Sequence, residues 1–282
     1  MTDDRALGPV DTSHLLLPIH RELVRLLRAL EPEQWLLPTT AGSWRVRDVA
    51  AHLLDGQLRR LSFQRDRLSR QDAPADQEYA SVLRFINGLN ARWVDASQHL
   101  SGRVLTDLLE TAGVQAATFL AALPPHEPAF WPVAWAGEAR SENWMDVGRD
   151  YTEYWHHQQQ IRDAVGAPGL VEARWLAPVV ALGVRAVAPA LAGVARPDGT
   201  SLRLVVSGDA GGRWRFVRES GAWRLEDDGS TAHAQATLRI DAPAVARLWY
   251  SGRGPRAASD DVAREGDREL CDAVLAARAV MV

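Results

Sequence analysis

Residues 150–161 of the chain read Asp-Tyr-Thr-Glu-Tyr-Trp-His-His-Gln-Gln-Gln-Ile, and residues 162–166 continue as Arg-Asp-Ala-Val-Gly. No Pro or Gly interrupts this stretch after Gly148. Gly166 followed by Pro168 is a common way for a helix to end. The stretch therefore predicts one long helix, and the remainder of the chain is organised around it.

This predicted helix has an apolar side and a polar side, because successive helical residues are 100° apart. Glu153 and His157 are four residues apart, which is the spacing at which one helix offers two ligands to a metal. An ordinary surface pair is the alternative interpretation. His156 falls on another side, and we expect it to be a solvated histidine. The apolar side carries Tyr151, Tyr154, Ile161 and Val165, the polar side carries Asp150, Glu153, His157 and Gln160, and the side of His156 carries Arg149, Gln159 and Asp163.

The composition is that of a globular chain that binds small molecules. Of its 282 residues, 46% are hydrophobic and 24% charged, and the net charge of -4 offers no basic surface for nucleic acid or an anionic membrane. All 32 basic residues are Arg, so Schiff-base chemistry through a lysine is excluded. The single cysteine, Cys271, cannot form an intramolecular disulfide or a thiolate cluster, which is typical of a reducing cytoplasm.

No membrane or secretory segment is expected. The first five residues are acidic and lack an apolar core, unlike a signal peptide. The most apolar run, from Trp175 to Val194, contains Arg185, Pro178 and Pro189, so it is interpreted as a buried helix. We therefore expect a soluble, cytoplasmic protein.

Four amphipathic helices are predicted before the long helix. The first spans residues 12–30, the second begins near Arg45, the third spans 76–100, and the fourth runs from about 105 to Pro124. Residues 126–140 are expected to form a loop rich in Pro, Trp and Gly. Such helices form a bundle, in which metal sites are built from inward side chains on facing helices.

His52 lies at the edge of the apolar stripe of the second helix. A lone histidine at such an edge is more often a core residue than a ligand, unless other ligands converge on it.

Beyond residue 169 the helical spacing of apolar residues is replaced by strand-like alternation of apolar and polar residues. Strands are expected near 201–206, 214–216, 223–225 and 236–240, separated by turn signals such as Glu219-Ser220-Gly221. A short helix follows Asp241, and a last helix spans 267–281. The prediction is an α+β protein with a four-helix bundle over residues 1–168 and a smaller α+β domain over residues 169–282.

The sequence resembles a known family in three places. These are Trp44-Arg45-Val46-Arg47-Asp48-Val49-Ala50-Ala51-His52-Leu53, the long helix with Glu153 and His157, and the C-terminal segments 236–241 and 266–270. The first two resemble the mycothiol-dependent maleylpyruvate isomerase family of the DinB-like superfamily, and the third resembles the sterol-carrier-like domain often fused to it.

The resemblance implies a divalent metal, expected to be zinc, with His52, Glu153 and His157 as its ligands. Two His and one Glu leave an open position, as in catalytic zinc sites. Two departures are visible: Arg45 stands where the family often has a Ser or Thr cap, and the glutamines after His157 stand where other members have Asp.

The resemblance also implies mycothiol as cofactor, whose thiolate adds to a conjugated double bond; rotation and elimination then give the trans product. A transferase would stop after the addition. The Arg-only, Ala-rich composition is typical of an actinobacterial source, in which mycothiol replaces glutathione. A zinc-dependent hydrolase with Asp150 as base and a non-enzymatic metal- or ligand-binding protein are the alternatives.

The remaining expectations concern catalytic residues and partners. Arg84 on the third helix is a candidate for binding an anionic substrate, and Asn90 on the same helix and Asp150 are further catalytic candidates. The expected partners are a small thiol and a small electrophilic substrate, without nucleic acid or membrane, and the chain is expected to be a monomer or homodimer.

Overall fold

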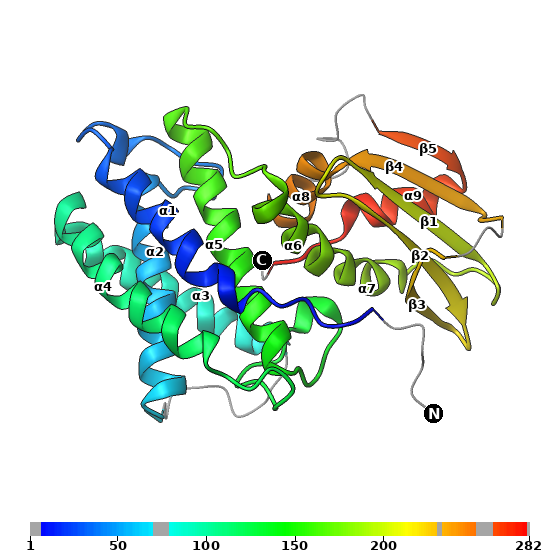
Figure 1. The fold of residues 1–282 in the computed structure, drawn as a ribbon, viewed down its shortest axis with the longest axis horizontal. Coiled ribbons are helices and arrows are strands. Elements are labelled where there is room, and N and C mark those ends of the chain that lie inside the picture. Colours follow the sequence, from blue (N-terminus) through cyan, green and yellow to red (C-terminus); the bar gives the residue numbers. More distant parts are fainter. Residues whose placement is uncertain (1–6, 70–78, 230–232, 252–261, 281–282) are drawn as a thin grey trace. The chain divides into compact units, whose positions relative to one another are not determined.

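The computed structural model describes residues 7–69, 79–229, 233–251 and 262–280. The chain divides into two compact units (Figure 1). The helical unit contains residues 12–130 and 142–170, and the α+β unit contains residues 7–11, 131–141 and those from 171 onward. The expected α+β class with an N-terminal helical bundle is confirmed. The loop was expected over residues 126–140 and within the bundle, but residues 131–141 group with the C-terminal unit.

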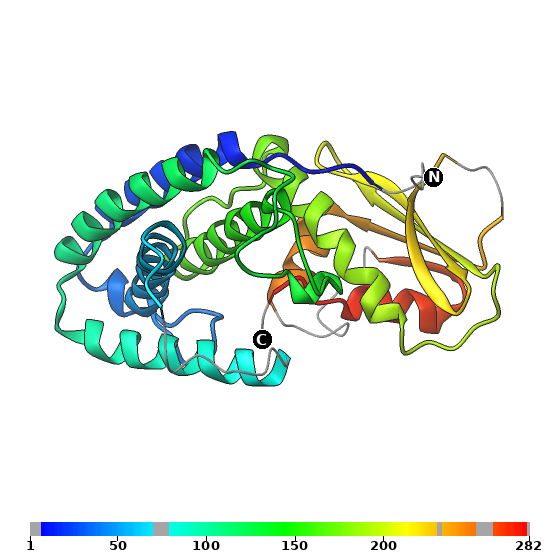
Figure 2. The same cartoon turned by 90° about the horizontal axis from the view of Figure 1, so that it is seen from below.

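Five long helices form the helical unit. They are α1 (Leu16–Arg28), α2 (Val46–Arg59), α3 (Tyr79–Ala96), α4 (Gly102–Ala121) and α5 (Asn143–Val165). Helices α1 and α4 lie side by side, and α2 packs against α3, α4 and α5. Figure 2 shows α3 on the side of α2 opposite to α1 and α4. The expected start of the third helix at residue 76 lies outside the described residues.

Short helical segments lie at the ends of these helices and between them. The chain forms 3-10 turns at Ser13–Leu15, Gln34–Leu36, Ser97–His99 and Ala134–Ala136, and α2 continues into a π-helical segment, Arg60–Arg65. π-Helical segments are rare and often lie at functional sites.

The helix ends follow local chemistry. The Asp48 carboxylate accepts a hydrogen bond from the backbone N–H of Arg45 at 2.9 Å, which satisfies a donor at the start of α2 despite the unusual Arg at that position. The Ser101 hydroxyl accepts from Val104 N–H at the start of α4. Gly166 ends α5 with a φ of 70°, a left-handed conformation that favours glycine.

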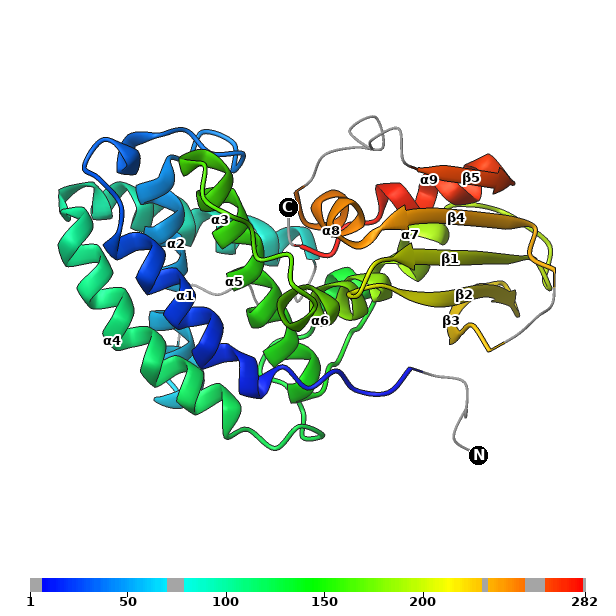
Figure 3. The same cartoon turned by 45° about the horizontal axis from the view of Figure 1, so that its top comes forward.

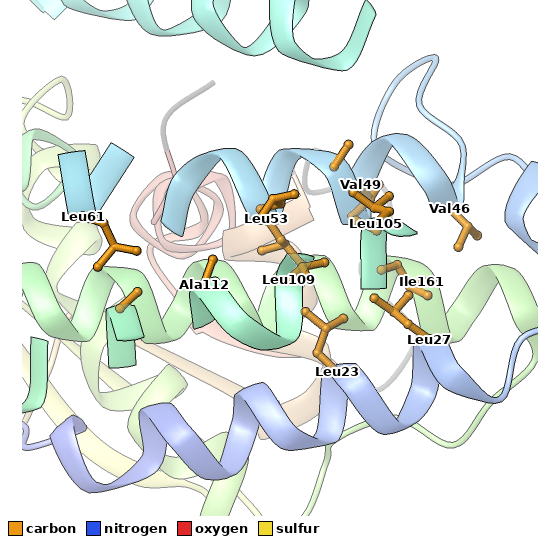
Figure 4. Close-up of a cluster of buried hydrophobic side chains, with 14 residues drawn as sticks. Leu23, Leu27, Val46, Val49, Leu53, Leu61, Leu105, Leu109, Ala112 and Ile161 are labelled. Carbon is orange, nitrogen blue, oxygen red and sulfur yellow. The ribbon is translucent and has the colours of Figure 1, made fainter. Parts of the chain in front are cut away.

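An apolar core fixes the packing of α1, α2, α4 and α5. Fourteen buried residues form it, and Figure 4 shows them meeting between the helices. Leu23, Val49, Leu109 and Ile161, one from each helix, are fully excluded from solvent. Replacing one such side chain by Ala typically costs about 2–5 kcal/mol, so this core holds α2 and α5 in the positions from which they present their polar side chains.

The α+β unit is built on a five-stranded sheet. Its strands are β1 (Ser201–Ser207), β2 (Gly212–Glu219), β3 (Ala222–Asp227), β4 (Ala236–Asp241) and β5 (Ala263–Gly266) in the order β3-β2-β1-β4-β5 (Figure 3). Only β1 and β4 pair in parallel among the pairs described. Ser220 and Gly221, both with positive φ, form a two-residue hairpin turn between β2 and β3, where a turn was predicted at Glu219-Ser220-Gly221.

Helices complete this unit. They are α6 (Ala173–Gly183), a 3-10 turn (Val184–Ala186), α7 (Val187–Leu191), α8 (Ala242–Ser251) and α9 (Arg268–Ala276). The Asp267 carboxylate caps α9, and the helix ends five residues before the predicted residue 281. By length and composition alone, the stretch Ala173–Leu191 could cross a membrane. However, 56% of its most apolar 18 residues are buried within the protein, and a 3-10 turn interrupts it.

Candidate metal centre

Helices α2 and α5 run antiparallel and bring His52, Glu153 and His157 together. One donor atom from each of these side chains lies within 4.8 Å of the others. The imidazole rings of His52 and His157 are 4.7 Å apart between centroids, in an edge-to-face arrangement. His157 Nε2 lies 3.1 Å from the Glu153 carboxylate, so the i,i+4 spacing on α5 has the close contact expected from it.

Burial and mutual contact set the charge of the cluster. Burial, together with the neighbouring His157, lowers the pKa of His52 to about 3, so His52 is neutral at physiological pH. Burial alone would raise the pKa of Glu153, but the hydrogen bond with His157 and the nearby imidazoles outweigh it and lower the pKa to about 2. Glu153 is therefore a carboxylate. A neutral imidazole and a carboxylate are the protonation states in which these groups bind metals.

Gln160 orients the His157 ring. Its carbonyl oxygen, which can only accept, lies 2.8 Å from His157 Nδ1, so Nδ1 donates to it and Nε2 faces Glu153. The Gln160 amide nitrogen is 3.0 Å from His156 Nε2. A partner that fixes the tautomer of a ligating histidine in this way is typical of metal sites.

The expectation that His156 is solvated is wrong. The residue is only 7% exposed, and its ring lies 5.0 Å from that of His157. Burial lowers its pKa to about 3, and the nearby His157 contributes to the shift. Arg149 and Gln159, expected on a solvated side, are also largely enclosed. The helical period correctly separated this side from that of His157, but a polar side of a helix can still be buried when its groups find hydrogen-bond partners.

The three side chains fit a divalent metal. His52 Nδ1 is buried and finds no hydrogen-bond partner among the described residues, which is costly unless a ligand completes the site. Nitrogen and oxygen donors around a tetrahedral zinc are about 3.4 Å apart, so the separation of up to 4.8 Å closes with small side-chain rotations. The ring of Trp44 packs beside His52, with 5.1 Å between the ring centroids.

Arg84 does not lie at this cluster. It is exposed and donates a hydrogen bond to the Ser81 hydroxyl at 3.0 Å. Asn90, on the same helix, faces α2 and accepts a hydrogen bond from Arg59 Nη2 at 2.5 Å. Arg59 also contacts the Asp55 carboxylate at 2.7 Å, and its side chain is 13% exposed. Arg59 lies close enough to His52 and Glu153 for their charges to interact, so it is a cationic side chain near the cluster, whereas the expected Arg84 is not.

Asp150 belongs to a buried ion-pair network. Arg60 at the start of the π-helical segment contacts both carboxylate oxygens of Asp150, at 2.6 and 2.9 Å, and both of Asp146, at 2.7 and 2.8 Å. Arg60 is 3% exposed and Asp146 is fully buried, with Arg149 as a further partner. Since its oxygens are engaged by Arg60, we infer that Asp150 positions α5 against α2 and does not act as a base.

Two residues of this region were not singled out from the sequence. Arg59 is seven residues after His52, two helical turns along the same face, and Gln160 is three residues after His157. Both spacings are visible in the sequence. In a chain with 32 arginines, however, helical spacing alone does not select Arg59 from the others.

Residues 16–162, more than half of the chain, match the sequence model of the mycothiol maleylpyruvate isomerase N-terminal domain family. Two solved structures have a similar fold: a crystal structure of the mycothiol-dependent maleylpyruvate isomerase, and one of a mutant in which a histidine is replaced by alanine. Each aligns with a TM-score of 0.53 and 12% sequence identity over 90% of this chain and 91% of the other. No curated protein matches the chain.

Proposed function

Because this chain belongs to the mycothiol maleylpyruvate isomerase family, we propose that it is a metal-dependent enzyme that uses a small thiol to isomerise, or to add to, a small electrophilic acid. Mycothiol is the proposed thiol, and a maleylpyruvate-like compound is the proposed substrate. The observation that supports the proposal is the convergence of His52, Glu153 and His157. The buried Nδ1 of His52 has no hydrogen-bond partner among the described residues.

In this proposal His52, Glu153 and His157 hold one divalent metal, expected to be zinc. When bound, such a metal lowers the pKa of a thiol, so that the thiolate exists at neutral pH. Gln160 keeps His157 in the required tautomer through their 2.8 Å contact, and Trp44 limits the access of water to His52. The only cysteine, Cys271, is buried, and burial raises its thiol pKa to about 11, so it does not serve as a nucleophile.

Hydrolysis is the less favoured chemistry for this site. It needs a carboxylate to accept a proton from water, and the expected base, Asp150, is engaged by Arg60. Asp55 on α2 is likewise paired with an arginine, Arg59, and Glu153 is needed as a ligand. The other alternative is a protein that binds metal but is not an enzyme. A turnover assay distinguishes this alternative from the proposed enzyme.

The proposal is tested by loading the protein with zinc or cobalt. We expect about one metal per chain by elemental analysis, and loss of that metal in His52→Ala. Adding mycothiol to the cobalt protein should produce a thiolate-to-cobalt absorption band, whereas glutathione should do so more weakly. If the metal binds and no thiol perturbs the cobalt spectrum or supports turnover, thiol-dependent chemistry is wrong for this chain.

Three further points belong to the proposal. We place the protein in the cytoplasm, as a monomer or homodimer without nucleic-acid or membrane partners.

We also propose that residues 1–168 and 169–282 fold as separate domains. Limited proteolysis tests this division, because a linker between separate domains should be cleaved near residues 166–169. Complete protection there, with cleavage elsewhere, would contradict it.

A further inference from the structure

Arg59 lies on the same face of α2 as His52, close to the end of the helix. The two residues are seven apart, so their side chains leave the helix in nearly the same direction, about 10.5 Å apart along its axis. The long side chain of an arginine spans much of this distance. Arg59 is thus positioned beside the metal cluster, with Asp55 between them on the helix.

Two hydrogen bonds hold the Arg59 guanidinium, and both use the same nitrogen. Nη2 donates to the Asp55 carboxylate at 2.7 Å and to the Asn90 side-chain oxygen at 2.5 Å. Nε is buried and has no partner among the described residues. A guanidinium has five donors in a planar fork, so this arrangement fixes the orientation of the group while leaving a buried donor unused.

Such a donor is costly unless a ligand accepts from it. Burial lowers the pKa of Arg59, since it destabilises the charged form, although the neighbouring carboxylates of Asp55 and Glu153 act in the opposite direction. The guanidinium is nevertheless charged at any physiological pH. It is a poorly hydrated cation with unused hydrogen-bonding capacity, close to Glu153 and His52.

We propose that Arg59, oriented by Asp55 and Asn90, binds a carboxylate of the substrate while another part of that molecule lies at the metal. Carboxylates match the planar guanidinium fork, and a carboxylate supplies the acceptor that Nε lacks. The inference rests on the proposed function, because it takes the cluster of His52, Glu153 and His157 as the metal site. It specifies the substrate as an anion with its carboxylate several bonds from the reacting centre.

The competing explanation is that Arg59 only connects α2 to α3. In that case the hydrogen bonds with Asp55 and Asn90 are the whole role of the Arg59 guanidinium. Removing it then changes the stability of the protein but not the binding of a ligand. Binding of a simple dicarboxylate therefore separates the two explanations without any measurement of turnover.

The experiment measures maleate binding by isothermal titration calorimetry on the zinc-loaded full chain, with zinc content determined in each sample. Arg59→Gln should weaken maleate binding by about 10- to 100-fold, as expected for loss of a charged hydrogen-bonded pair. Arg59→Lys, which keeps the charge but not the fork, should lose less. Arg25→Gln is the matched control, because Arg25 is 71% exposed on α1 and should bind maleate like the wild type.

Equal maleate affinity in Arg59→Gln and wild type, at equal zinc content, would overturn the inference, as would a wild type that binds no maleate. If Arg59→Gln does not fold, Arg59→Lys and Asn90→Leu provide the test, since each should weaken maleate binding while retaining zinc. A failure of the proposed function looks different: maleate binding still depends on Arg59, but mycothiol leaves the cobalt spectrum unchanged.

Discussion

Replacing Arg60 by Met should destabilise the helical unit strongly, because Arg60 connects the end of α2 to the first half of α5. Its guanidinium makes four hydrogen bonds of 2.6–2.9 Å to Asp146 and Asp150. Met has a similar length and is apolar, so it fills most of the same space. The change therefore removes the charge and the hydrogen bonds while leaving little cavity.

The magnitude follows from what remains after the substitution. Asp146 is fully buried and, among the described residues, keeps Arg149 as its remaining ion-pair partner, and Asp150 is 21% exposed. Removing one partner of a buried ion pair typically costs about 3–5 kcal/mol, because a buried charge is left uncompensated. For a unit of about 150 residues this corresponds to a melting temperature lower by roughly 6–20 °C.

The assay is thermal unfolding followed by far-ultraviolet circular dichroism on metal-free protein at pH 7 and near pH 4. In the wild type, burial raises the pKa of Asp146, but the charges of Arg60 and Arg149 outweigh this and hold it below its usual value. This carboxylate therefore contributes stability above about pH 4, which is lost as the pH falls through the folded pKa. In Arg60→Met, protonation of Asp146 removes the uncompensated buried charge. The difference in melting temperature between this variant and the wild type should therefore be smaller near pH 4 than at pH 7.

Arg28→Met is the matched control. Arg28 also contacts two carboxylates, those of Asp107 and Glu110 at 2.6 and 2.7 Å, but all three side chains are 42–52% exposed. Exposed ion pairs contribute little, so the melting temperature should hardly change. Equal effects of the two substitutions, or an Arg60→Met effect that is the same at both pH values, would refute the argument that buried charge causes the loss.

Four other substitutions test the metal centre and the packing of the helical unit. His157→Ala should abolish zinc binding in elemental analysis, whereas His156→Ala should keep nearly one zinc per chain; the reverse ranking would mean that the wrong histidine was assigned. Gln160→Leu should weaken zinc binding by about 10- to 100-fold in chelator competition, because it removes the acceptor that fixes the His157 tautomer, and an unchanged affinity would contradict that role. Gly113→Ala should destabilise the protein by about 1–3 kcal/mol in urea unfolding, because the added Cβ would lie 2.1 Å from the buried ring of His20; a neutral effect would show that this ring can move.

The fold was predictable where periodicity is strong. The apolar stripes of the first, second and fourth helices gave these elements to within a few residues, and the turn at Ser220-Gly221 gave the β2–β3 hairpin. Strand β5 was not predicted, because Ala263–Gly266 is four residues long, without apolar alternation, and obtains its structure only by pairing with β4. The last helix ended early for a similar reason, since tertiary context decides helix ends.

The candidate site was predictable only in part. The spacing of Glu153 and His157 is a property of one helix, so the sequence contains it directly. The approach of His52 depends on the packing of α2 on α5, and the resemblance to a family supplied it. Burial of His156 and the choice of Arg59 over Arg84 depend on which helix faces which, and helical period alone does not contain that information.

The antiparallel packing of α2 and α5 orders the polar groups of the helical unit in layers. His52 meets His157, and eight residues further along α2 Arg60 meets Asp150, which is seven residues further back on α5. Arg59 and Asp55 lie between these layers. A shift of one helical turn between α2 and α5 would move His52 away from His157. It would also separate Asp146 from Arg60 and leave the buried carboxylate without this partner. The ion-pair network therefore penalises the same misalignment that would separate the metal ligands, which gives a physical reason for burying so costly a group of charges beside the site.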